Sequence, residues 1–254
     1  MMITILAPAK RMEVGAPEWA DDTGRPFFEA KTGELVEALR GYSVDEMGAL
    51  MKVSDGIATE TVARFASFSF GEKGATSALF AYRGDAYLGI DAESLSAEGV
   101  RWAEGRLRVL SGLYGALSPF TGVEPYRLEM GLSLPGFGVL STWWRASLTE
   151  HLKGLMGPDG VLLNLASGEY AKAVDKKVIR SCGRFVDVAF KEKKGDTLKA
   201  VAIHAKRARG AMVRWIIENR IDCVEDVKGF DVNGYRFDEA LSTEDSLLFV
   251  RESN

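Results

Sequence analysis

The sequence contains little cysteine and little histidine. Its 254 residues include two of each, and neither pair has the spacing of a metal site or a redox motif. Cys182 and Cys223 lie far apart along the chain, as do His151 and His204. We therefore expect no structural disulfide, no zinc site of the usual kind and no cofactor, in a reduced cytoplasmic setting.

Long apolar runs and the common catalytic motifs are also missing. No run of about 18 apolar residues is present, so no membrane span is predicted. The first residues, MMITILAP, have neither the basic start nor the cleavage site of a secretory signal, so none is expected. The chain has no GxxxxGK[ST] loop, no GxGxxG fingerprint and no GxSxG elbow. A cleft of Lys, Arg, Tyr and Glu that works without a metal remains open.

Charge of opposite sign is concentrated in two adjacent segments of the chain. Residues 176–220 hold thirteen Lys/Arg against four Asp/Glu, whereas residues 221–254 hold three against nine. The whole chain carries a net charge of only −4. Because a local positive field attracts anions whatever the total charge is, the basic segment is the main functional indication.

The basic segment includes a predicted helix over residues 204–219. At about 100° per residue, one apolar stripe is formed by Ala205, Ala208, Met212, Trp215 and Ile216. Arg207 and Arg214 lie on the opposite, solvated face. Arg209 lies at the edge of the stripe and Lys206 a little beyond it, where a charge needs a partner. That partner is either an anionic ligand or an internal carboxylate.

The remaining pattern predicts a single compact domain over residues 1–254 of the α+β class, mixing helices and strands. Helices are predicted over Phe27–Leu39, Ser96–Leu107 and Ser141–Leu155. Strands are predicted over Ile3–Leu6, Ser77–Tyr82, Arg108–Leu110, Val161–Leu165 and Leu247–Val250. A hairpin of Arg184–Lys191 and Thr197–His204, turning at Lys194-Gly195-Asp196, leads into the basic helix and completes a basic unit over residues 184–220.

A second unit, residues 43–68, has the outline of a helix-hairpin-helix element. Ser43 and Glu46 form a capping box for a helix that ends near Lys52, Val53–Ile57 interrupt it, and Thr59–Phe68 form a second helix. In DNA-binding elements of this kind, hairpin amides and the second helix's N-terminus hold a phosphate. The alternative is an ordinary helical hairpin packed on the core, and the small number of bases favours it.

Polar residues at strand ends and turns are the candidate cleft residues, because sites assemble there. Candidate cleft-lining residues are Ser111, Tyr114, Tyr126, Asn164, Ser167 and Tyr170. Candidate catalytic groups are Lys10, Glu129, Glu169 and Lys206. Arg127 and Glu129 either pair with each other or face the cleft. Gly112 and Gly115 permit a tight turn and the close approach of another segment.

Seven stretches in collinear order together resemble the YaaA family, the bacterial peroxide stress proteins. They are Pro8–Lys10, Leu50–Ala58, Leu110–Phe120, Glu124–Gly131, Asn164–Tyr170, Phe190–Asp196 and Ala205–Ile221. The resemblance implies a distinctive mixed α/β fold with a helix-hairpin-helix element and a basic cleft. It also implies binding of double-stranded DNA with little sequence preference, and protection against hydrogen peroxide by limiting free iron and oxidative damage.

By matching position, the resemblance places the DNA-binding hairpin and basic cleft on particular residues. The hairpin falls on Ser54, Asp55, Gly56 and Ile57, and the basic cleft on Lys10, Arg127, Lys206, Arg207 and Arg209. Lys52, just before the hairpin, supplies a further base and is predicted to bind DNA or an anion with them. Ala7, where the family usually has Ser, Arg11–Glu13, where it has Thr-Leu-Asp, and Gly168 depart from the pattern. The departures bear on the chemistry of the pocket, and the scarcity of bases in the second helix bears on DNA affinity.

Three functions follow as hypotheses. The first is a monomeric DNA-binding stress protein. The second is an enzyme that acts on a nucleotide or nucleobase-like anion, with Glu129 or Glu169 as general base and Lys206 or Arg209 as oxyanion partner. The third is direct handling of iron, for which scarce His and Cys leave only a carboxylate site in the acidic tail.

Overall fold

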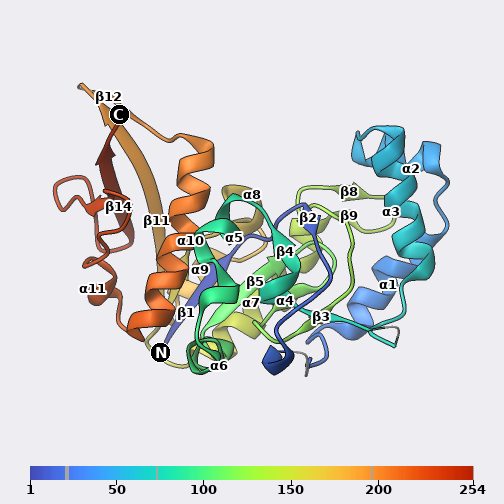
Figure 1. Ribbon diagram of the computed structural model, residues 1–254, viewed down its shortest axis with the longest axis horizontal. Coiled ribbons are helices and arrows are strands. Elements are labelled where there is room, and N and C mark those ends of the chain that lie inside the picture. The colour runs from blue at the N-terminus through green and yellow to red at the C-terminus, as the bar shows by residue number, and fades with distance from the viewer. Residues whose placement is uncertain (21–22, 73, 196, 254) are drawn as a thin grey trace.

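A mostly parallel β-sheet forms the centre of the molecule (Figure 1). The computed structural model describes residues 1–20, 23–72, 74–195 and 197–253, and within them the sheet has eight strands. The parallel strands, in spatial order, are β14 (Ser246–Glu252), β11 (Gly183–Lys194), β10 (Gly160–Asn164), β1 (Met2–Leu6) and β5 (Leu107–Ser111). Antiparallel strands β13 (Arg236–Phe237), β6 (Gly115–Leu117) and β12 (Thr197–Lys199) extend β14, β5 and β11.

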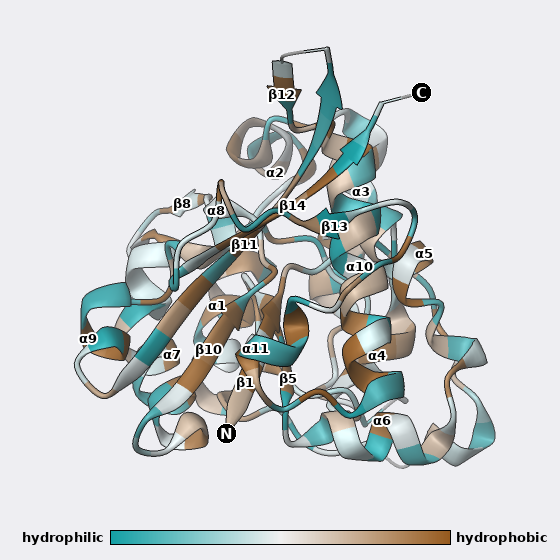
Figure 2. Ribbon diagram, turned by 90° about the vertical axis from the view of Figure 1, so that its left-hand side faces the viewer, coloured by the Kyte–Doolittle hydropathy of each residue, from teal (hydrophilic) through white to brown (hydrophobic). Residues whose placement is uncertain are grey.

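Helices lie on both sides of this sheet, as a parallel sheet requires. Every residue of β1 and of β5 is buried. Figure 2 shows α7 (Leu140–Met156) and α9 (Lys176–Arg180) on one side of the apolar strands and α10 (Ala202–Asn219) on the other. The upper end of β11 and its partner β12 carry hydrophilic residues beyond the core.

Smaller elements surround the sheet. The other α-helices are α1 (Glu29–Arg40), α2 (Val44–Met51), α3 (Asp55–Ser67), α4 (Ala78–Ala81), α5 (Asp85–Ile90), α6 (Ala97–Glu104), α8 (Gly168–Ala171) and α11 (Val224–Val227). Short strand pairs are β2 (Arg11–Met12) with β4 (Tyr82–Arg83), β3 (Thr76–Ser77) with β7 (Gly122–Val123), and β8 (Ser133–Leu134) with β9 (Gly138–Val139). Among the described residues, no helix is both long and apolar enough to cross a membrane.

The predicted mixture of helices and strands is confirmed, and the structure adds that most of the sheet is parallel. The strand predicted over Ser77–Tyr82 is wrong. Ala78–Ala81 form the short helix α4, with the short strands β3 and β4 on either side. All four helical residues are buried, and a fully buried apolar run has no period that separates a helix from a strand.

Both predicted strands of the basic hairpin are confirmed, but the second strand is shorter than predicted. β12 ends at Lys199 and α10 begins at Ala202, so the last residues of the predicted second strand are helical. Gly195 has a φ of +59°, as a tight glycine turn requires. Asp196, the last residue of the predicted turn, lies outside the described residues.

The helical pair α2–α3 begins as predicted but turns earlier. Ser43 Oγ accepts a hydrogen bond from Glu46 N, and Glu46 Oε2 accepts one from Ser43 N, which confirms the capping box. Lys52 closes α2 with a left-handed backbone, φ 53°. The predicted hairpin over Ser54–Ile57 is corrected, because Asp55 already begins α3, with Ser54 at the N-cap.

A half-buried histidine near buried Arg108, at the amino-terminal end of β5, makes stability depend on pH. Arg108 is 3% exposed and donates to the carbonyls of Glu104 and Leu107. The ring of His151 packs on Phe27, with 4.6 Å between centroids. Burial, and then the charge of Arg108, lower the pKa of His151 to about 4. Protonation of His151 therefore favours the unfolded chain.

We expect this histidine to reduce stability as the pH falls from 6.5 toward 4. Its folded pKa is below the unfolded value, so the stability present at pH 7 is lost on acidification. Because the ring is partly exposed, we expect a loss of about 1 kcal/mol between pH 7 and pH 5. Urea unfolding of the wild type and of His151→Phe at both pH values measures it. Equal losses in the two proteins would contradict this assignment.

Candidate functional site

The candidate site lies at the carboxyl ends of β1 and β10. β1 pairs with β5 on one side and with β10 on the other. The chain runs from β1 to β5 and later crosses back to β10, so the order of the strands reverses at β1. In open α/β sheets, ligands bind outside the carboxyl ends of the strands at such a switch point. The segments that leave the two strands, residues 7–10 and 165–170, both line a recess there.

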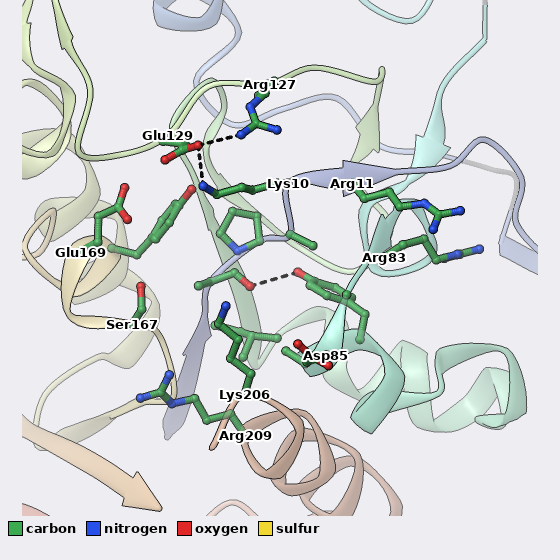
Figure 3. Close-up of a pocket in the computed structure, with 18 of the residues that line it drawn as sticks. Lys10, Arg11, Arg83, Asp85, Arg127, Glu129, Ser167, Glu169, Lys206 and Arg209 are labelled. Atoms are coloured by element: carbon green, nitrogen blue, oxygen red, sulfur yellow. Dashed lines mark hydrogen bonds and ion pairs between the residues drawn. The ribbon is translucent and has the colours of Figure 1, made fainter. Parts of the chain in front are cut away.

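This central recess has a volume of about 470 Å³. Its charged lining residues are Lys10, Arg11, Arg83, Arg127, Lys206 and Arg209, with Asp85, Glu129 and Glu169. Its apolar and aromatic lining includes Leu6, Pro8, Tyr87, Tyr126, Leu128, Leu165 and Tyr170, and Ser167 adds a hydroxyl. In Figure 3 two clusters of charged groups lie at opposite ends, Lys10, Arg127 and Glu129 at one end and Lys206 and Arg209, with Asp85 beside them, at the other; Arg11 and Arg83 lie at one side and Glu169 at the other.

Glu129 organises the first cluster. Its Oε1 lies 2.8 Å from Lys10 Nζ and 3.3 Å from Arg127 NH2 (Figure 3). The two cations therefore share one carboxylate, which leaves donor capacity on both. Glu169 is engaged differently: its Oε1 accepts a 2.8 Å hydrogen bond from Gly131 N and so fixes the segment that follows Glu129.

The second cluster projects from the first half of α10. Lys206 and Arg209 are three residues apart, so they share one side of the helix. Among the described residues, neither has an ion-pair partner, and Arg209 Nε is buried without a hydrogen-bond acceptor. Burial lowers the pKa of the Arg209 guanidinium. An anion in the recess would supply the partner that a buried cation needs.

A network of tyrosines forms the floor between the clusters. The hydroxyl of Tyr126 lies 2.6 Å from Ser111 Oγ and 2.9 Å from Tyr82 Oη. Tyr87 Oη donates to the carbonyl of Ala7 at 3.3 Å, which joins α5 to the end of β1. Burial raises the pKa of Tyr126 to about 12. The phenols therefore stay neutral near pH 7 and brace the recess.

The segment that carries Arg127 and Glu129 belongs to no β-strand, but its side chains alternate between buried and partly exposed. Tyr126, Leu128 and Met130 point inward and are buried, while Arg127 and Glu129 are partly exposed. A Cβ at Gly112 would lie only 2.4 Å from Leu128 O. The predicted close approach at this glycine is thus made by the backbone of the site itself.

Three further recesses share lining residues with the central one, and one of them, about 380 Å³, shares Arg11, Arg83, Gly84 and Tyr87 with it and also carries Glu13, Asp91 and Glu93. The other two adjoin the charged clusters. The Asp187 recess, about 650 Å³, includes Asn164, Lys172, Lys176, Lys177 and Asp187 and shares Arg209 with the central recess. The Lys52 recess, about 560 Å³, is lined by Lys52 and residues 131–133 and shares Glu129 and Glu169 with the central recess. None of the described residues from 221 to 253 lines any of the four.

The structure brings together many, but not all, of the candidate residues. Lys10, Tyr126, Arg127, Glu129, Ser167, Glu169, Tyr170, Lys206 and Arg209 line the central recess, Lys52 lines the Lys52 recess, and Asn164 lines the Asp187 recess.

Expectations about four positions are corrected. Ser111 and Tyr114 are buried behind the recess, where Ser111 Oγ binds the Tyr126 hydroxyl and accepts from Tyr114 N. Asn164 Nδ2 donates to Asp187 Oδ1 at 2.7 Å, so this amide faces the neighbouring recess. Arg207 is not among the residues that line the recesses, but its NH2 lies 3.5 Å from Oδ1 of Asp85, which does line the central recess.

Sequence reasoning missed Arg83, Asp85 and Tyr87, which follow the wrongly predicted strand. The sequence signal that could have found these residues is the Gly84-Asp85 pair, which begins α5 in the structure. Gly84 has a φ of +159° there. Sequence reasoning also missed Lys172 and the roles of Lys176 and Lys177. No group of three or more His, Cys, Asp or Glu that could hold a metal occurs in the part of the chain that the structure describes.

Fold and recess together define a mixed α/β protein with a charged recess at the switch point of a mostly parallel sheet. A family model described as peroxide stress protein YaaA matches residues 2–241, and the chain belongs to this family.

Full-length relatives agree with this assignment. A UPF0246 protein of Paracidovorax citrulli is 40% identical over 259 residues, covering 99% of each chain. One of Polaromonas naphthalenivorans is 41% identical over 256 residues, covering 98% of each. One of Maricaulis maris is 41% identical over 254 residues, covering 98% of this chain and 96% of the relative.

Proposed function

We propose that the chain binds double-stranded DNA with little sequence preference and protects against hydrogen peroxide by limiting free intracellular iron and oxidative damage. The observation that carries the DNA-binding part is the row of three adjoining recesses that runs from the carboxyl end of β10, past that of β1, to the end of α2. They share Arg209 on one side and Glu129 and Glu169 on the other. An extended row suits a polyanion better than a single small ligand.

The charges of this row favour an anion. Its basic residues are Lys10, Arg11, Lys52, Arg83, Arg127, Arg145, Lys172, Lys176, Lys177, Lys206 and Arg209. Its acidic residues are Asp85, Glu129, Glu169, Asp175 and Asp187. Basic side chains thus exceed acidic ones in a protein whose net charge is −4. Phosphate contacts from Lys and Arg supply affinity without reading base edges, which is why little sequence preference is expected.

Two projecting units flank the row. In Figure 1 the β11–β12 hairpin rises on one side and the α2–α3 pair on the other. The hairpin carries exposed Lys193, Lys194 and Lys199. The N-terminus of α3 presents Gly56, where a Cβ would meet no atom within 4 Å. In the proposed complex, α2–α3 acts as the helix-hairpin-helix element and the helix N-terminus accepts a phosphate.

Membership of the peroxide stress family supports the physiological part of the proposal. The second candidate function is an enzyme that acts on a nucleotide-like anion. The volume of the central recess, about 470 Å³, and the two carboxylates in its lining, Glu129 and Glu169, favour that candidate.

Salt dependence tests the DNA-binding function. With about five phosphate contacts, we expect duplex affinity to fall roughly 10²- to 10³-fold between 50 and 200 mM salt. Fluorescence anisotropy with two labelled duplexes of unrelated sequence measures it, and the two affinities should agree within about threefold. No binding at the lower salt concentration, or an affinity that salt leaves unchanged, would refute the proposal.

A further inference from the structure

The central recess differs from the Asp187 and Lys52 recesses in its walls. The walls next to the clusters are apolar and aromatic, with Leu6, Leu128 and Leu165 among the tyrosines. Phosphate contacts alone need no such surface, because a DNA backbone is polar along its whole length. Apolar walls with a few polar groups at fixed positions are typical of a small-molecule site, and about 470 Å³ lies within the usual range of such pockets.

The polar groups of the central recess lie at its two ends, and the two ends differ in their charged groups and in how these are paired. At one end, Lys206 and Arg209 are cations with no carboxylate partner among the described residues, and Arg209 Nε is buried without an acceptor. Asp85 lies beside this end in Figure 3 but has Arg207 as its ion-pair partner at 3.5 Å, so Lys206 and Arg209 can take an added anion. At the other end, Glu129 presents a carboxylate between Lys10 and Arg127, so donors and acceptors lie side by side (Figure 3).

We infer that the central recess binds one nucleoside monophosphate unit, with its phosphate on Lys206 and Arg209 and its base against the apolar walls. The edge of the base, which carries both donors and acceptors, then faces Glu129, Lys10 and Arg127. This inference deepens the proposed function, since a free nucleotide and an unstacked nucleotide of bound DNA share this chemistry. Tyrosine and leucine walls suit the flat face of a base.

Titration of the full chain with single nucleotides tests the inference. Isothermal titration with AMP and dTMP should show saturable binding, at least tenfold tighter than with inorganic phosphate or the unphosphorylated nucleosides. Arg209→Gln should weaken the binding of either nucleotide at least tenfold. Arg101→Gln removes the same charge from exposed Arg101 on α6 and should leave nucleotide binding unchanged.

Melting of the ligand-free variants separates a lost contact from a lost fold. Arg209→Gln should melt at or above the wild-type temperature, because the substitution removes a cation whose Nε is buried without an acceptor. Should Arg209→Gln fail to fold, Lys206→Gln provides the same test at a more exposed position. Nucleotides that do not bind at millimolar concentration, or that bind Arg209→Gln as well as the wild type, would overturn the inference.

A duplex with 2-aminopurine opposite an abasic position distinguishes the two sources of the nucleotide. A rise in fluorescence on binding, absent in Arg209→Gln, assigns the bound unit to the DNA strand. Binding of free AMP without that rise assigns the recess to a free nucleotide. Duplex binding with no response to mononucleotides or to the 2-aminopurine duplex would refute the inference and leave the DNA-binding function standing. Binding of mononucleotides without any duplex binding would support the inference and refute the proposed DNA-binding function.

Discussion

Replacing Lys206 and Arg209 together by glutamine is expected to lower the affinity for a short duplex about 100-fold at 50 mM salt. Each side chain is a cation without a carboxylate partner among the described residues, so its charge is available to a phosphate. A charge-assisted phosphate contact contributes on the order of 1.5 kcal/mol, about tenfold in affinity. Fluorescence anisotropy measures the change.

The salt dependence of the same variant provides an independent check. Loss of two phosphate contacts should reduce the slope of log K against log salt by about 1.8. The control is Arg101→Gln with Lys153→Gln, which removes one charge from exposed Arg101 on α6 and one from half-buried Lys153, paired with Glu150, in the last turn of α7. The control lowers the net charge equally, so it corrects for the long-range field. Equal losses in the two double variants would remove α10 from the binding surface.

Gly210→Ala is expected to destabilise the fold by about 2–3 kcal/mol, although alanine is the better helix former. A Cβ at Gly210 would lie 1.7 Å from Ala86 O, and one at Gly89 would lie 2.2 Å from Arg207 O. α5 and α10 thus cross backbone to backbone at two glycines. Helix propensity favours alanine by about 1 kcal/mol, but overpacking against rigid backbone outweighs it.

The control for this substitution is Gly154→Ala in α7. No atom lies within 4 Å of a Cβ built at Gly154, so there only propensity acts, and we expect a gain of up to about 1 kcal/mol. Urea unfolding followed by tryptophan fluorescence measures both variants. If Gly210→Ala stabilised the protein, the backbones of α5 and α10 would have to lie farther apart at their crossing than in the structure. Since α10 carries Lys206 and Arg209, loss of this crossing should also weaken DNA binding.

The elements with a clear period could be predicted from the sequence. The apolar stripe predicts α10, and the Ser43–Glu46 capping box predicts α2, because both signals are local. The helix α4 could not be predicted, since its four residues are uniformly apolar and buried. The predicted start of α3 is misplaced because Asp55 and Gly56 look like turn residues, although Asp55 suits the first turn of a helix.

The residues of the site, too, could be predicted only where a local pattern marks them. Lys10 is identifiable because it follows a buried strand, and Arg127 and Glu129 because polar and apolar residues alternate around them. The sharing of Glu129 by Lys10 and Arg127 depends on the order of strands in the sheet, which no local pattern encodes. The predicted positions of Ser111 and Tyr114 are wrong because a strand-end residue can face the site or lie behind it, and only packing decides.

In the proposed complex, DNA lies along the three recesses and leaves the acidic C-terminal segment free. Hydrogen–deuterium exchange of the full chain, with and without a 20-base-pair duplex, is the decisive test of this arrangement. We predict slower exchange in residues 7–12, 50–57, 126–133, 166–177 and 202–210, and unchanged exchange in residues 222–245. Protection confined to residues 222–245, or to α6 and the last turns of α7, would contradict it.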